Sequence, residues 1–150
     1  MKKLLFVVVA ALTLSASSVY ASTYETAVSN KLKVSFRDAF ANVKDVKWYT
    51  DDNKTFTAKF TLNNTTVSAY FDAEGQLLVT SRVIEAESLP LAVVNRLVKK
   101  YPGNKINTVV EYESAGGTVY MIMLEGDKTW IKVKADETGN IELKERLQKA

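Results

Sequence analysis

The residue types that most enzymes use for nucleophilic and metal chemistry are missing from this sequence. It contains no histidine and no cysteine. Ser-His-Asp and Cys-His catalysis and the common zinc sites are therefore excluded. The Ser-x-x-Lys pattern of another class of serine nucleophiles is absent as well. We accordingly predict no catalytic residue, no cofactor and no metal site, in a protein that is not an enzyme.

The remaining acidic residues are spaced for turns. Asp51-Asp52, Asp72 with Glu74, and Asp136-Glu137 each mark a turn between predicted strands. None of them has the alternating ligand spacing of a calcium loop. Glu111 and Glu113 share one face of a predicted strand and could form an acid/base pair, although the sequence places no pocket around them.

A strongly patterned hairpin is the central element of the first half. Asn63-Asn64 favours a two-residue type I′ turn, because asparagine tolerates positive φ. This turn pairs Leu62 with Thr65, Phe60 with Val67, Ala58 with Ala69, and Phe56 with Phe71, and places apolar residues on one face. A one-residue slip would reverse that face, so the pattern and the turn predict the same register.

Two amphipathic helices are expected, one in each half. Leu32, Phe36, Ala39, Phe40 and Val43 recur at helical spacing. In the second half, Ser88 is the expected N-cap, Pro90 lies in the first turn and Pro102-Gly103 ends the helix. The expected buried face of this second helix is Leu91, Val94, Leu97, Val98 and Tyr101.

Each helix is followed by strands, so the same order of elements occurs twice. The first half adds strands at 46–50 and 76–84 to the hairpin, and the second has strands at 107–112, 118–124, 128–135 and 139–146. Leu77 and Val79 are expected to face inward, and the tail after Arg146 is expected to fray.

The two halves also align residue by residue. Phe36, Phe40 and Val43 match Val94, Val98 and Tyr101 at an offset of 58, and Val46, Trp48, Phe60, Val67 and Gly75 match Val110, Tyr112, Leu124, Ile131 and Gly139 at an offset of 64. Such self-similarity indicates a duplicated unit.

The first 21 residues are typical of a signal peptide. A basic start, Met1-Lys2-Lys3, precedes an apolar run from Leu4 to Leu14 and a cleavage-like Val19-Tyr20-Ala21. Removing Lys2 and Lys3 from 20 basic residues leaves 18 against 17 acidic ones, so the net charge falls from +3 to +1. We therefore expect a periplasmic or secreted protein that is not a lipoprotein. We expect no nucleic-acid partner and no membrane attachment after cleavage.

A known family resembles this chain through its core and turn positions. The stretch from Val34 to Trp48, the hairpin, and Tyr70-Phe-Asp-Ala-Glu-Gly75 are similar to the PepSY-like domain of exported bacterial proteins. The second half is similar through Leu89-Pro90, Tyr101-Pro102 and the turn from Asp136 to Gly139. The resemblance implies an α+β fold like that of the β-lactamase inhibitor. It predicts one domain over residues 22–150, built of two repeats at about 29–84 and 86–147, each with a helix and a four-stranded antiparallel sheet.

One outer sheet face of the second repeat is unusual. If Tyr120, Ile122, Leu124, Ile131 and Val133 face inward, methionine, tryptophan and lysine residues face outward together. Exposed apolar groups of this kind mark interaction sites on soluble proteins. The alternative is that the two repeats pack together, or that a terminal segment covers the patch. The predicted binding residues are Trp130, Met121, Met123, Val119, Lys132, Lys134 and, in the first repeat, Tyr70.

These features together predict an exported, non-enzymatic module that binds a protein or peptide through its open sheet face. Two alternatives stay open: a carrier for a small ligand, which needs an internal cavity, and a hydrolase or lyase that uses carboxylates and lysines, which needs a cleft with convergent carboxylates.

Overall fold

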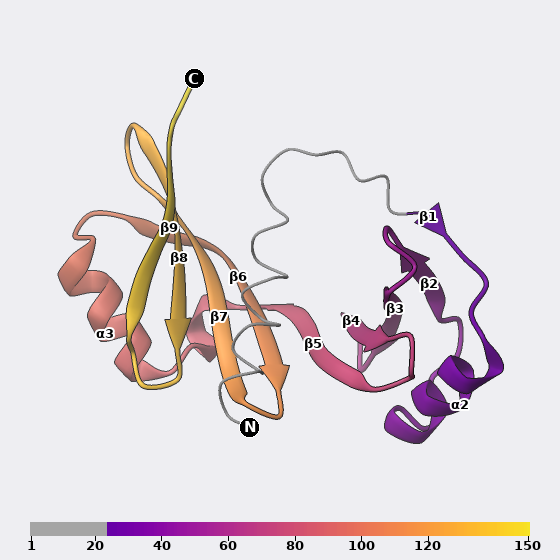
Figure 1. The fold of residues 1–150 in the computed structure, drawn as a ribbon. Coiled ribbons are helices and arrows are strands. Elements are labelled where there is room, and N and C mark those ends of the chain that lie inside the picture. Colours follow the sequence, from indigo (N-terminus) through magenta and orange to yellow (C-terminus); the bar gives the residue numbers. More distant parts are fainter. Residues whose placement is uncertain (1–23) are drawn as a thin grey trace. The chain divides into compact units, whose positions relative to one another are not determined.

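The computed structural model describes residues 24–150. The expected signal peptide, residues 1–21, lies outside the described residues. The elements, labelled in Figure 1, are β1 (Tyr24–Glu25), α2 (Asn30–Ala39), β2 (Lys47–Thr50), β3 (Thr55–Leu62), β4 (Thr65–Asp72), β5 (Leu77–Ile84), a 3-10 turn η1 (Ala86–Ser88), α3 (Leu91–Lys100), β6 (Lys105–Ser114), β7 (Gly117–Glu125), β8 (Thr129–Asp136) and β9 (Ile141–Gln148).

The nine strands of the described chain form a mostly antiparallel sheet in which the strand order follows the sequence. Contacts divide the chain into two compact units. The first unit contains the described residues up to Ser81 and 114–116, and the second contains 82–113 and 117–150. Each unit has its own helix and its own apolar core.

The hairpin of the first unit has the register that the sequence predicts. Leu62 pairs with Thr65, and the pairing continues through Ala58 with Ala69 to Phe56 with Phe71. Asn63 and Asn64 both have positive φ, at 48° and 64°, as a type I′ turn requires.

Helix α2 covers the first core with an aromatic cluster. Ser29 caps the helix by accepting a hydrogen bond from the Leu32 N–H at 3.3 Å. The ring centroid of Phe36 lies 5.1 Å from that of Phe60 and 5.7 Å from that of Trp48, both in edge-on geometry. The buried residues of this core are Leu32, Phe36, Trp48, Ala58, Phe60, Val67, Ala69 and Phe71.

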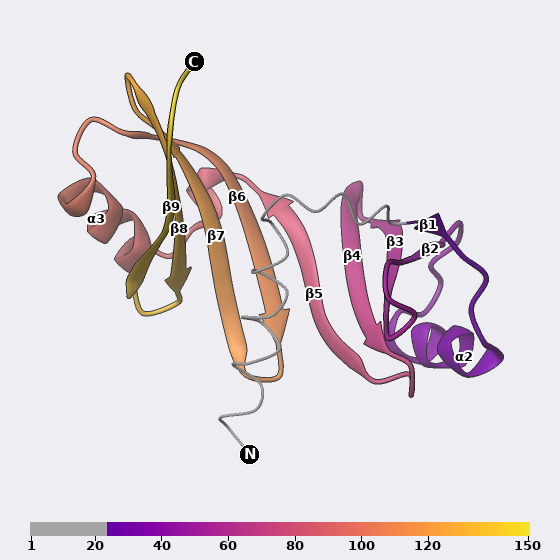
Figure 2. The ribbon, with the colours of Figure 1, turned by 45° about the horizontal axis from the view of Figure 1, so that its top comes forward.

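Helix α3 covers the second core and lies beside β8 and β9 in both ribbon views (Figures 1 and 2). A turn of the sheet approaches the helix closely: a Cβ on Gly139 would stand 2.8 Å from the Ala92 carbonyl oxygen. The buried residues of this core are Leu89, Val93, Leu97, Tyr101, Val109, Tyr120, Ile122, Leu124, Ile131, Val133 and Ala135.

The predicted buried face of α3 is wrong at two positions. Leu91 is 72% exposed and Val98 is 65% exposed, whereas Val93, which the prediction omits, is fully buried. The apolar residues of α3 cover a wide part of its circumference, so the sequence allows either side of this apolar stripe to pack on the strands. The edge that contains Val93 is the one that packs into the second core, and Gly139 lies close to the neighbouring Ala92.

The C-terminal ends of the two helices match each other at an offset that differs from the predicted 58. The two helices end alike, because the Phe40 N–H donates to the Phe36 carbonyl oxygen and the Tyr101 N–H donates to the Leu97 carbonyl oxygen. Phe40 thus corresponds to Tyr101 and Phe36 to Leu97, at an offset of 61.

Smaller differences concern the ends of elements. Ser88 is not an N-cap: it ends the 3-10 turn η1, and α3 begins after Pro90. The chain stays extended at Leu89 so that this side chain enters the core, where it is 6% exposed. Leu77, at the start of β5 beside a turn, is 41% exposed.

The expected frayed tail after Arg146 is instead part of the sheet. Strand β9 continues to Gln148, and the Lys149 N–H donates to the Lys128 carbonyl oxygen at 2.9 Å. Backbone pairing with β8 holds this segment, which side-chain patterning alone does not reveal.

Candidate functional site

The candidate site is a sheet surface of the second unit, which we call the outer face. It consists of side chains that lie opposite to the α3 side of β7 and β8. Cross-strand pairs place Met121 opposite Lys134, Met123 opposite Lys132, and Glu125 opposite Trp130. The outer face is defined by Val119, Met121, Met123, Trp130, Lys132 and Lys134.

The face is less exposed than the sequence suggests. Met121 is only 8% exposed, so the expectation that this methionine is open to solvent is wrong. Val119, Met123 and Trp130 are half-buried. Met121 pairs with Lys134 on the neighbouring strand β8, and the aliphatic stem of a lysine in such a position can cover apolar surface.

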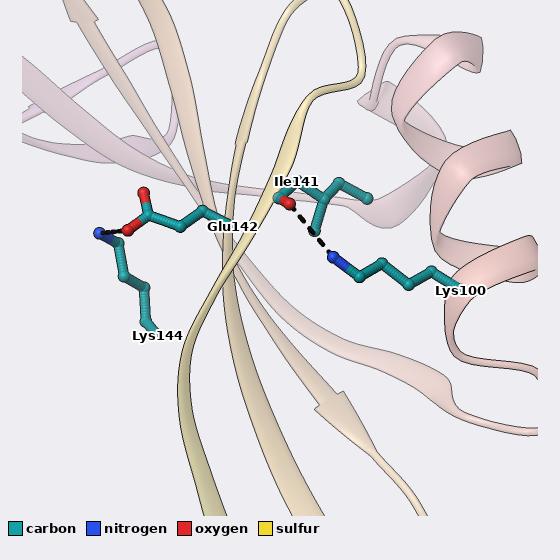
Figure 3. Close-up of polar contacts among 4 residues, drawn as sticks. All are labelled: Lys100, Ile141, Glu142 and Lys144. Carbon is teal, nitrogen blue, oxygen red and sulfur yellow. Dashed lines mark hydrogen bonds and ion pairs between the residues drawn. The ribbon is translucent and has the colours of Figure 1, made fainter.

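Strand β9 extends this face with charged side chains. Glu145 lies opposite Lys132 and Glu142 lies opposite Lys134. Figure 3 shows Glu142 and Lys144 pointing away from α3, with Lys144 Nζ 2.6 Å from Glu142 Oε1. The hydrogen bond from Lys144 lowers the pKa of the Glu142 carboxyl, and the charges of Lys144 and Lys134 lower it further. This carboxylate is therefore engaged with its own strand.

Lys132 is a cation of the outer face that forms no ion pair within residues 24–150. It stands opposite Glu145, but no ion pair joins them in residues 24–150. It is half-buried between Met123 on β7 and the β9 strand. A cation in this position can pair with a carboxylate from outside the chain.

Trp130 is held by a residue from the C-terminal tail. Lys149 Nζ lies 4.9 Å from the centroid of the Trp130 ring and 2.7 Å from Glu125 Oε1. Leu147 stands directly opposite Trp130 on β9. These contacts position the indole ring. The sequence prediction missed Lys149, Glu125 and Leu147, because it treated the tail as frayed.

Tyr70, the remaining predicted binding residue, lies in the first unit. It pairs with Thr57 on the outer face of β4, and its hydroxyl lies 3.5 Å from Ser81 Oγ. The first unit also has an aromatic–lysine contact, with Lys59 Nζ 5.0 Å from the centroid of the Tyr49 ring. Around it, however, stand threonines and Ser68 where the second unit has methionines.

Glu111, one member of the acid/base pair considered from the sequence, is engaged with Arg82. Glu111 Oε1 lies 2.7 Å from Arg82 Nε, and only 14% of the glutamate side chain is exposed. Asp136 accepts hydrogen bonds from Thr138 and Asn140 within its own turn. No group of three or more acidic side chains within residues 24–150 is arranged to hold a metal ion.

Comparison with known proteins places the fold. No protein-family model matches the sequence, and no curated protein matches it. Solved structures do match, each with a TM-score of 0.69. A BLIP-like protein from Bacteroides fragilis is 18% identical and covers 83% of this chain and 90% of its own.

Two further solved structures from the same genus agree. A DUF2874 family protein from Bacteroides uniformis is 16% identical over 81% of this chain and 90% of its own. A protein from Bacteroides eggerthii described as a candidate periplasmic protein is 11% identical over 82% and 90%. The chain thus has a BLIP-like fold. The finer PepSY-like assignment is not confirmed.

One finding bears on the membrane question. In the part of the chain from residue 24 onward, no helix combines the length and the apolar character needed to cross a membrane.

Proposed function

We propose that this protein is an exported, non-enzymatic binding module that recognises a protein through the outer face of its second unit. The observation that carries the proposal is the half-buried Trp130 beside Met123 and Lys132 on one sheet surface. Tryptophan and methionine are both enriched at the centres of protein interfaces, and tryptophan is among the residue types that supply most of the binding free energy.

The charges indicate the partner's chemistry. Lys132 has no ion-pair partner in the described chain and lies next to the apolar centre of the face. A segment that presents an apolar side chain beside an Asp or Glu would bury the former against Trp130 and pair the latter with Lys132. We therefore assign the partner as a protein segment with one apolar anchor and an adjacent carboxylate.

The ordered indole supports this role. The Lys149 contact and the opposite Leu147 already restrict the Trp130 side chain. A restricted side chain loses little conformational entropy on binding, so more of its buried area contributes to affinity.

The test is partner capture from periplasmic extract with matched variants. We expect the unchanged chain and Tyr49→Ala to retain the same partner, and Trp130→Ala and Lys132→Glu to lose it. Tyr49→Ala is the matched control, because it removes the aromatic–lysine contact of the first unit.

Fluorescence provides a second readout. Trp48 is buried in the first core, so a partner on the outer face should shift mainly the Trp130 emission. Capture that is unchanged in both Trp130→Ala and Lys132→Glu, with all proteins folded, would overturn the proposal.

We also infer that the chain contains two copies of one α+β unit. Asp72 and Asp136 form the same turn: the backbone N–H of each donates to the carbonyl oxygen of the residue four positions later, and its Oδ1 accepts that residue's N–H. Gly75 and Gly139, both at positive φ, face a helix in each case. A crystal structure tests this inference, since the copies should superpose with Val67 on Ile131 and Gly75 on Gly139; another register would contradict it.

A further inference from the structure

We infer that the second unit carries a separate anion-binding pocket that takes a small polyanion of the phosphate class. The pocket has a volume of about 500 Å³ and lies between the last turns of α3 and the start of β9. Its lining is Arg96, Lys99, Lys100, Asn140 and Ile141, and includes no acidic residue.

The three cations share one face of α3. Arg96, Lys99 and Lys100 are spaced at i, i+3 and i+4, and all three are exposed. In the described part of the chain, neither Arg96 nor Lys99 forms an ion pair or a side-chain hydrogen bond. Like charges at this spacing repel one another, and a bound anion would relieve that repulsion.

One cation is fixed toward the pocket. Lys100 Nζ donates a hydrogen bond to the Ile141 carbonyl oxygen at 3.3 Å, as Figure 3 shows. This contact bridges α3 to β9 on the side opposite to Glu142 and Lys144, so the pocket is distinct from the outer face.

Neither Glu142 nor Asp136, two acids close to this site along the chain, neutralises it: Glu142 points away from α3 and pairs with Lys144, and Asp136 is engaged in its own turn. Asp136 receives N–H and O–H hydrogen bonds from Thr138 and both backbone and side-chain N–H bonds from Asn140. Its carboxylate is thus saturated by its own turn. The side-chain amide of Asn140 is used in the same turn, which leaves ligand recognition to the arginine and the lysines.

Stabilisation of a helix end is the simpler explanation for cations at this place, because the last turn of a helix attracts positive charge. The other helix provides an internal comparison. When the ends of α2 and α3 are matched at Phe40 and Tyr101, the positions of Arg96, Lys99 and Lys100 correspond to Ser35, Asp38 and Ala39. The fold therefore does not require this cluster, and α2 ends with Arg37 alone.

The ligand class follows from the groups present. An arginine fork and two ammonium groups match the several oxygens and the multiple charge of a phosphate or pyrophosphate. A single monovalent anion would leave most of the three positive charges unpaired.

The experiment is an NMR titration of the purified protein with pyrophosphate at constant ionic strength. We expect saturable shifts of the Asn140 and Ile141 amides. Arg96→Gln and Lys99→Gln should each weaken binding about tenfold, the usual cost of one charge-assisted hydrogen bond. Both side chains are exposed, so these variants should fold normally.

Arg37→Gln is the matched control, because it removes a cation from the last turn of the other helix. It should leave pyrophosphate binding unchanged. Absence of saturable shifts at millimolar pyrophosphate would overturn the assignment, as would equal weakening by Arg37→Gln. Equally tight binding of citrate would overturn the phosphate class.

Discussion

At the scale of single residues, hydrogen bonds set the behaviour of the turn carboxylates. Asp136 has a pKa of about 2, below the ordinary 3.8, chiefly because the Thr138 hydroxyl and the Asn140 amide donate to it. Backbone N–H donors lower the pKa of Asp52 in the same way, against a contribution from burial that raises it. These carboxylates stabilise their turns by accepting hydrogen bonds from nearby residues of the same turn.

The depressed pKa predicts a pH-dependent stability. Because the folded pKa lies below the unfolded one, Asp136 stabilises the fold above its unfolded pKa, and this contribution is lost as the pH falls toward 2. Asp136→Asn should lower the free energy of unfolding at neutral pH by about 1 kcal/mol or less, because solvent screens this partly exposed group. Urea unfolding at neutral and acid pH measures the difference, which should vanish in acid.

Asp127→Asn is the control for that measurement. Asp127 is exposed and makes no side-chain hydrogen bond or ion pair in the described chain. Removing its charge should change stability little at any pH. A difference for Asp136→Asn that persists undiminished at acid pH would show that the carboxylate charge is not the cause.

At the scale of elements, a glycine in each unit lies close to the helix of that unit. A Cβ on Gly139 would meet the Ala92 backbone oxygen at 2.8 Å, whereas one on Gly75 would meet the movable Ser35 hydroxyl at 2.6 Å. Gly103, which follows α3, has nothing within 4 Å of its Cβ position. All three have positive φ.

These contacts predict the order in which alanine substitutions at the three glycines lower the free energy of unfolding. Gly103→Ala should cost about 1 kcal/mol, from backbone strain alone. Gly139→Ala should cost about 3 kcal/mol, because the helix must also shift to relieve overpacking. Gly75→Ala should fall between them. Urea unfolding of the three variants gives the order, and equal costs would show that the helix contact has no energetic weight.

At the scale of the whole molecule, the two cores share no residue. Phe36 contacts four other aromatic rings of the first core, including Phe40 and Phe71. Removing the Phe36 ring leaves a cavity lined by residues of the first core alone. The stability of each unit should therefore respond first to changes in its own core.

Phe36→Ala should lower the free energy of unfolding by about 3–5 kcal/mol. In hydrogen exchange, the amides of β3 and β4 should accelerate more than those of β7 and β8. Val34→Ala, an exposed change on the same helix, should alter stability by less than about 0.5 kcal/mol. Equal acceleration in both units would instead show a single cooperative unit.

The sequence by itself determined the features that depend on neighbouring residues. Alternating side chains and the positive φ of Asn63-Asn64 define the hairpin and its register without help from distant residues. The inward set Tyr120, Ile122 and Leu124 was predictable for the same reason, since the period of two fixes which residues share a face.

The exposure of individual apolar side chains and the order of the C-terminal tail depend on contacts between residues that are distant in the sequence. Val93 is buried and Leu91 is exposed, although both are apolar, and Gly139 from a distant turn lies against the intervening Ala92. Lysine neighbours on β8 reduced the exposure of Met121, and pairing with β8 ordered the tail that brings Lys149 onto Trp130. Helical and strand periodicities specify a face, but how far that face is covered depends on groups that only the folded chain brings together.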